Sequence, residues 1–215
     1  MGASPFPLRD SNVPLAAAAP VRQAAHVAGR DLERNALNIN PGGWAVETLR
    51  PIATLLGSCV AVCFYDPKFR LAGMNHFLLP SRGSGAHADA DIVLGGDYAL
   101  EVLVNSMLGK GARKDRLVAK AFGGGTIVSS IRMAIGDRNA QFAREWLERE
   151  GIPLVASDFG GPWSRKVVLD PASGDAYCRR IRTTQADVAK VVEAESRYEQ
   201  SLMKPAAVEK KIELF

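Results

Sequence analysis

The chain has 215 residues, of which 47% are hydrophobic and 23% are charged, a composition typical of one globular domain with a sizeable core. Its net charge of +4 is spread along the chain and is not interleaved with aromatic side chains, which argues against a nucleic-acid-binding protein. No apolar run approaches the roughly 18 residues of a membrane span, and three cysteines are too few for a disulfide framework. We therefore expect a cytoplasmic protein with reduced thiols and no membrane insertion.

Residues 1–42 are predicted to be a flexible N-terminal tail. Four prolines and an alanine run fall in its first half, and such a segment buries too little apolar surface to offset the entropy lost on ordering. The body of the protein is expected over residues 43–183. Residues 184–215 are predicted to form a C-terminal helix, with Thr184 as its N-cap and its end near residue 202, followed by a tail.

Predicted strands outnumber predicted helices in the body. The clearest hairpin joins two apolar runs across Asp66-Pro67-Lys68, because Asp and Pro favour the first positions of a turn. The other predicted strands are 46–56, 117–122, 153–157, 165–169 and 176–182. The predicted helices are 97–109, with Asp97 as its N-cap, and 138–150, with Asp137 as its N-cap. This pattern predicts an α+β fold with a largely antiparallel sheet.

Cys59 and His76 lie toward the outer ends of this hairpin. If the hairpin is centred between Pro67 and Lys68, residues whose numbers sum to 135 face each other, and Cys59 and His76 form such a pair. Directly opposed side chains point to the same sheet face, about 5 Å apart at Cβ, whereas a slip of one residue would separate them. The register therefore predicts a thiol and an imidazole side by side, next to a turn at residues 57–58.

A thiol beside an imidazole can act as a nucleophile with its base. Backbone N–H groups of Gly57, Ser58 and Cys59 could lower the pKa of the thiol and hold an oxyanion, while His76 would move the proton. The structural alternative is a buried thiol and a hydrogen-bonded sheet histidine. Asn75 is on the opposite strand face and is not expected to orient His76.

The glycine run that begins at Gly123 and Gly124 follows a strand, but it lacks the residues of a Walker A loop. Glycines allow close approach of the backbone, so we expect this run beside the active site, lining a substrate groove. Farther along, Asp158 and Arg165 are predicted to form a structural ion pair.

The remaining cysteines and histidines carry less information. Cys63 and Cys178 lie inside strand-like runs and are interpreted as core residues. His26 and His87 have no companion ligands, so no metal site is predicted.

Several motifs resemble those of the CheD family, the chemoreceptor glutamine deamidases. The resemblance covers about residues 43–183. The matching segments are LGSCVAV at 56–62, YDP at 65–67, GMNHFLLP at 73–80, FGG at 122–124, IGDRN at 135–139, DFGG at 158–161 and RKV at 165–167.

The resemblance implies a cytoplasmic enzyme that hydrolyses glutamine side chains of methyl-accepting chemotaxis receptors to glutamate without a cofactor or metal. It implies packed β-sheets flanked by helices, similar to the catalytic domains of deamidating bacterial toxins. The family's nucleophile and histidine correspond to Cys59 and His76. A family threonine six positions before the cysteine corresponds to Ala53, so the neighbouring Thr54 is a candidate for that role. Some family members also bind the CheC phosphatase.

The receptor target would be a long helical bundle, so we expect a shallow groove that admits one extended glutamine side chain, with loop 81–90 as a candidate rim. Three other functions stay open at this point. The chain could be a non-catalytic regulator that binds receptors or a phosphatase, a cysteine peptidase or transglutaminase-like enzyme, or a basic nucleic-acid binder.

Overall fold

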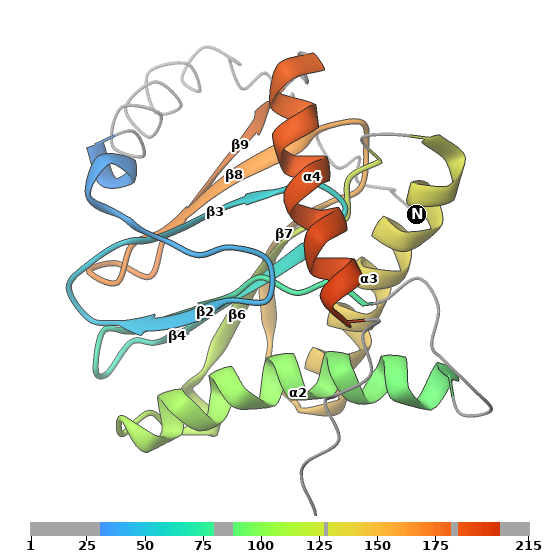
Figure 1. The fold of residues 1–215 in the computed structure, drawn as a ribbon. Helices are drawn as coiled ribbons and strands as arrows, with labels where there is room; N and C mark the ends of the chain where they lie inside the picture. The colour runs from blue at the N-terminus through green and yellow to red at the C-terminus, as the bar shows by residue number, and fades with distance from the viewer. Residues whose placement is uncertain (1–30, 80–87, 127–128, 182–184, 203–215) are drawn as a thin grey trace, which may run out of the picture.

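The structure, a computed structural model, describes residues 31–79, 88–126, 129–181 and 185–202. It contains two β-sheets packed face to face, with helices covering the outer face of the larger sheet (Figure 1). The α+β fold of packed, largely antiparallel sheets flanked by helices is confirmed. None of the described helices is long and apolar enough to cross a bilayer.

The described elements are β1 Leu37–Asn38, β2 Trp44–Glu47, β3 Ile52–Leu56, β4 Val60–Asp66, β5 Leu71–Asn75, α2 Ala88–Gly109, η2 Lys114–Arg116, β6 Val118–Gly123, α3 Ser129–Arg149, β7 Leu154–Phe159, β8 Ser164–Leu169, β9 Ala176–Ile181 and α4 Gln185–Leu202. The smaller sheet has the order β1-β3-β8-β9 and the larger has the order β2-β5-β4-β6-β7. The pairs β1–β3 and β6–β7 are parallel, and the other pairs are antiparallel.

Strand β4 lies at the centre of the core because it is buried on both faces. Val60, Val62 and Phe64 point toward the helices and belong to the cluster that includes apolar side chains of α2 and α3. Ala61 and Cys63 point the other way, into the cluster shared with the smaller sheet. Successive side chains of a strand alternate between faces, so a strand buried on both sides is expected to be a continuous apolar run, as this one is from Val60 to Phe64.

The hairpin of β4 and β5 forms, but its predicted register is wrong. Cys63 pairs with Met74 and Phe64 with Gly73, so facing residues sum to 137 rather than 135. The turn has four residues, 67–70, because pairing ends at Asp66 and Leu71. A shift of two residues leaves every side chain on its predicted face, and the expected neighbourhood of Cys59 and His76 therefore survives.

The predicted starts of the two central helices are also wrong. Helix α2 begins at Ala88 and α3 at Ser129, so Asp97 and Asp137 lie inside helices and are not N-caps. The glycines just before these two aspartates, Gly96 and Gly136, are packing positions inside the helices. A Cβ on Gly96 would lie 2.5 Å from Phe142 Cζ, and one on Gly136 would lie 2.6 Å from the carbonyl oxygen of Gly124.

The body begins earlier than the predicted boundary at residue 43. Strand β1 pairs with β3, and the Gly42 N–H donates to the His76 carbonyl at 2.7 Å. The predicted strand 46–56 is two strands in different sheets, β2 and β3, separated by a bend at residues 48–50 and by Pro51. The strands predicted from residue 117 onward are confirmed within one to two residues at each end. The final helix is also confirmed, although its predicted cap, Thr184, lies outside the described residues.

Gly96→Ala tests the packing role of this glycine. We expect the added methyl group to lower the free energy of unfolding by about 1–3 kcal/mol, because Phe142 and Leu79 leave no room for it. The matched control is Gly109→Ala in the same helix, where a Cβ would meet nothing within 4 Å. Urea titrations of both variants measure the difference, and equal stability of the two would contradict the packing assignment.

Candidate active site

Residues 57–59 form a turn that carries the chain from β3 in the smaller sheet to β4 in the larger sheet. All three carbonyl oxygens of this turn accept hydrogen bonds from the body of the protein. The donors are Gly125 N–H to Gly57 at 2.7 Å, Asn139 Nδ2 to Ser58 at 2.9 Å, and Gly124 N–H to Cys59 at 2.8 Å. In a trans peptide the N–H of a residue points away from the carbonyl of the residue before it, so the N–H groups of Ser58 and Cys59 point to the other side of the turn, and the Gly57 N–H points there as well.

Those three N–H groups converge on one carboxylate, that of Glu195 in α4. Oε1 accepts from the N–H groups of Gly57 at 2.9 Å and Cys59 at 3.0 Å. Oε2 accepts from the Ser58 N–H at 3.1 Å and from the Ser58 hydroxyl at 2.7 Å. Burying a carboxylate costs several kcal/mol, but hydrogen bonds to a charged acceptor contribute roughly 1.5–3 kcal/mol each, so four of them offset this cost.

His76 follows β5, and its backbone is held on both sides: its N–H donates to the Gly43 carbonyl at 2.9 Å and its carbonyl accepts from Gly42. On the side chain, Nδ1 lies 2.8 Å from Thr54 Oγ1, and that hydroxyl donates to the Ile39 carbonyl at 2.9 Å. A hydroxyl has only one proton, so Nδ1 must carry a proton and donate it to Thr54. The neutral ring then has its lone pair on Nε2, which has no hydrogen-bond partner among the described residues.

The thiol, the imidazole and the carboxylate meet at one place. Cys59 Sγ, a ring nitrogen of His76 and a carboxylate oxygen of Glu195 all lie within 4.8 Å of one another. Burial lowers the pKa of His76 to about 4, against the opposing influence of the Glu195 charge, so the ring is neutral near pH 7. A neutral imidazole with an unoccupied Nε2 can accept a proton from a neighbouring thiol.

The site is covered, which differs from the shallow open groove predicted from the sequence. Cys59 and His76 are 0% and 1% exposed, and α4 lies over them because Glu195 binds the turn. Tyr198, three residues farther along α4, has its pKa raised by burial and then by the negative charge that Cys59 would carry as a thiolate. Loop residues 81–87, the predicted rim, lie outside the described residues, whereas 88–90 begin α2.

Thiolate, imidazole and carboxylate are also zinc ligands, so these three groups could in principle hold a metal ion. The hydrogen bonds of Glu195 argue against this use. Both of its oxygens already accept from neutral donors that point at them, and a metal ion would have to displace those interactions. The geometry fits an anion held by backbone N–H groups better than a carboxylate waiting for a cation.

The structure thus brings together most of the residues predicted from the sequence. Thr54, rather than Ala53, contacts His76, because Ala53 faces the outer cluster of the smaller sheet while Thr54 faces inward. Gly123 and Gly124 are buried behind the turn and support it: a Cβ on Gly123 would lie 2.1 Å from the Cys59 carbonyl oxygen. They are not on the side where the N–H groups of the turn converge.

The sequence reasoning missed two residues of the site. Asn139 is fully buried and bridges the Ser58 carbonyl to the N–H of Leu79, 2.9 Å from each. Its motif at 135–139 has no local feature that indicates a contact with the turn. The sequence predicts a helix around Glu195 but no role for this side chain, since its partners lie more than a hundred residues away in the sequence.

Other predicted residues lie away from the site. Asp158 and Arg165 form the expected ion pair at 3.2 Å, and Arg180, with Arg165, lowers the pKa of Asp158 to about 2. Cys63 is buried and Asn75 bonds Val62 and Ala99 rather than His76, both as expected.

The remaining predictions are a core position for Cys178 and no metal-ligand role for His26 and His87. Cys178 is only half-buried, although burial raises the pKa of its thiol to about 12. His26 and His87 lie outside the described residues.

The Thr54–His76 contact gives a prediction about the histidine tautomer. In the wild-type protein and in Thr54→Ser, nitrogen NMR should show the proton of the neutral His76 ring on Nδ1. In Thr54→Val the acceptor is gone, so this preference should be lost, and the buried N–H left without a partner should cost about 1–3 kcal/mol of unfolding free energy. A wild-type ring that carries its proton on Nε2 would contradict the assignment.

Comparison with known proteins agrees with the family resemblance of the motifs. A family model described as CheD chemotactic sensory transduction matches residues 78–180. A Dechloromonas aromatica protein named probable chemoreceptor glutamine deamidase CheD 2 is 56% identical over 189 residues, which cover 86% of this chain and 96% of that protein. A protein of the same name from Burkholderia thailandensis is 43% identical over 188 residues, with coverages of 86% and 96%. A Shewanella oneidensis CheD 1 is 40% identical over 172 residues, with coverages of 79% and 82%. This chain belongs to the CheD family.

Proposed function

We propose that this chain hydrolyses glutamine side chains of chemotaxis receptors to glutamate, with Cys59 as the nucleophile and His76 as the general base and acid. The relatives named as chemoreceptor glutamine deamidases support the reaction and the substrate. The observation that carries the assignment of residues is the turn at 57–59. It presents three N–H groups to a side-chain carboxylate beside a thiol and an imidazole.

The first half of the reaction forms a thioester. Cys59 Sγ attacks the side-chain carboxamide carbon of the substrate glutamine, and the thiol proton passes to His76 Nε2. The oxygen of the carboxamide becomes an oxyanion, which the N–H groups of the turn stabilise because they already point to that position. The C–N bond then breaks, and His76 gives its proton to the departing nitrogen, so that ammonia leaves.

The second half regenerates the enzyme. His76 accepts a proton from a water molecule that attacks the thioester carbon, and the N–H groups of the turn again hold the oxyanion. The C–S bond breaks, the sulfur recovers a proton from His76, and glutamate is released. In both halves Thr54 keeps the proton on His76 Nδ1, so the transferred proton always enters and leaves at Nε2.

The substrate would be a glutamine on the helical bundle of a methyl-accepting receptor, and the enzyme would act in the cytoplasm, where such bundles signal. A CheC-type phosphatase is a further candidate partner. The proposed chemistry uses only side chains and backbone of this chain, and it needs no metal or organic cofactor. The alternative is a non-catalytic regulator that binds receptors or a phosphatase through the same surface.

Purified receptor incubated with Cys59→Ala tests the reaction. We expect no ammonia and no conversion of glutamine to glutamate by peptide mass spectrometry, because the nucleophile is gone. The matched control is Cys63→Ala, which removes a buried thiol from the same strand face, four residues away, where burial raises the pKa. That variant should keep its activity. Wild-type turnover by Cys59→Ala would contradict the mechanism, and receptor binding without any conversion by the wild type would favour the regulator.

A further inference from the structure

Helix α4 lies over the site and docks through very few side chains. Its described side chains are those of residues 189–202, and among these Val191 and Glu195 are the buried ones, with Tyr198 half-buried on the same face. Glu193 and Arg197 point outward. A helix that serves only to cover a core buries an apolar stripe, whereas this one places a carboxylate at the centre of its contact face.

The surroundings of Glu195 are those that the proposed reaction assigns to the substrate. Its carboxylate is bound by the N–H groups of residues 57–59 and lies within 4.8 Å of the reactive atoms of Cys59 and His76. This carboxylate is the end group of a glutamate side chain that projects from a helix. A glutamine on a receptor helix would become this same group after hydrolysis.

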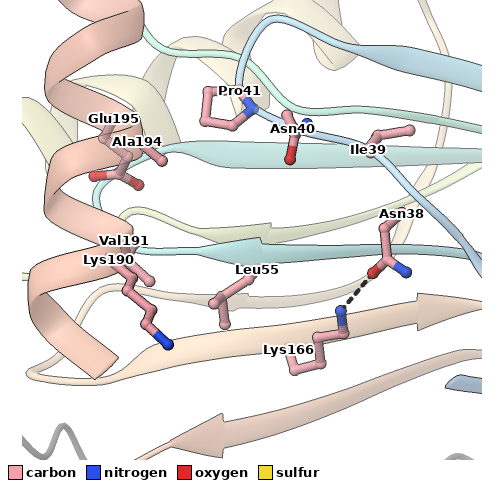
Figure 2. Close-up of a pocket in the computed structure, with 10 residues that line it drawn as sticks. All are labelled: Asn38, Ile39, Asn40, Pro41, Leu55, Lys166, Lys190, Val191, Ala194 and Glu195. Atoms are coloured by element: carbon pink, nitrogen blue, oxygen red, sulfur yellow. Dashed lines mark hydrogen bonds between the residues drawn. The ribbon is translucent and has the colours of Figure 1, made fainter. Parts of the chain in front are cut away.

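The groove under α4 is not completely filled. A cavity of about 160 Å³ lies beside Glu195, between α4 and the body, and is lined by Asn38, Ile39, Asn40, Pro41, Leu55, Lys166, Lys190, Val191, Ala194 and Glu195 (Figure 2). Lys190 of α4 and Lys166 of β8 both border this cavity, and Lys166 Nζ donates to Asn38 Oδ1 at 2.7 Å and lies 3.9 Å from Glu33 Oε1. Because this cavity remains beside Glu195, α4 fills its groove incompletely, which suits a segment that another helix can displace.

We infer that α4 is an internal mimic of the product: it occupies the groove in which a receptor helix binds, and Glu195 takes the place of the newly formed glutamate. The inference rests on the proposed function and adds two properties to it. The substrate segment is bound as a helix, with its glutamine side chain reaching the turn at 57–59 from the direction of Glu195. Binding of this segment and docking of α4 exclude each other, so the enzyme turns over only when α4 has left.

Glu195→Gln gives the sharpest test, because it converts the mimic of the product into a mimic of the substrate. In the full-length variant, the glutamine introduced at position 195 should be hydrolysed to glutamate, with a first-order rate that does not depend on protein concentration. Gln200, exposed on the same helix, serves as the internal control, and Glu193→Gln as the matched variant; both of these glutamines should remain unchanged. Adding Cys59→Ala to Glu195→Gln should abolish the conversion.

A second experiment measures how far α4 shields Cys59 from a reagent in solution, and it does not depend on the deamidation reaction. Cys59 in the full-length wild type should react slowly with a small neutral alkylating reagent, as measured by peptide mass spectrometry. Val191→Lys, which removes the apolar contact of α4 and keeps the Glu195 charge, should speed this reaction about tenfold or more, since a minor open state becomes the major one. The exposed Glu193→Ala should behave as the wild type.

The outcomes separate the two proposals. Receptor deamidation by the wild type, together with self-conversion of the Glu195→Gln variant, supports both. Receptor deamidation without any self-conversion of that variant would overturn the product-mimic inference alone. If the wild type does not deamidate receptors, the proposed function fails, and the alkylation rates alone decide whether α4 occludes Cys59. Equal alkylation rates of Cys59 in the wild type and in Val191→Lys would overturn the inference that α4 occludes Cys59.

Discussion

The orientation of three consecutive peptide groups determines the rest of this site. In a trans peptide the C=O and the N–H point in opposite directions. Within one peptide group the N–H belongs to the residue after the carbonyl. Because the carbonyl oxygens of Gly57 and Ser58 are bonded to the body, the N–H groups of Ser58 and Cys59 are presented to the other side, where the Gly57 N–H joins them at Glu195. Buried N–H groups need hydrogen-bond acceptors, so a group with acceptor oxygens must lie on this side of the turn. Asn139 and the glycines behind the turn therefore matter to the site although none of them contacts Glu195.

The same donors explain both the resting state and the chemistry. At rest they bind the Glu195 carboxylate, and during the proposed reaction they would bind an oxyanion at the same position. The proton acceptor, His76, does not depend on these N–H groups. Thr54 and the Ile39 carbonyl fix its tautomer from the side of β1 and β3. Burial keeps the ring neutral, so the closed site holds its proton acceptor ready beside the thiol.

Much of the site was predictable because strand geometry has a period of two. The predicted hairpin register was wrong by two residues, yet Cys59 and His76 kept their shared face. The same alternation decides between Ala53 and Thr54, since only Thr54 faces inward. The predicted helix starts were wrong because an aspartate before an apolar run is typical of an N-cap, whereas Asp97 and Asp137 lie inside α2 and α3. Glu195 was not predictable from local pattern, because its role depends on a contact between distant parts of the chain.

The most direct test of the account is the capture of the covalent intermediate. The wild-type protein is mixed with a glutamine-containing receptor segment, quenched in acid within a turnover, digested and examined by mass spectrometry. The account predicts an acyl group on Cys59, linked through the substrate glutamine side chain, that disappears as glutamate accumulates. Glutamate formation with the acyl group on another residue would show that Cys59 is not the nucleophile.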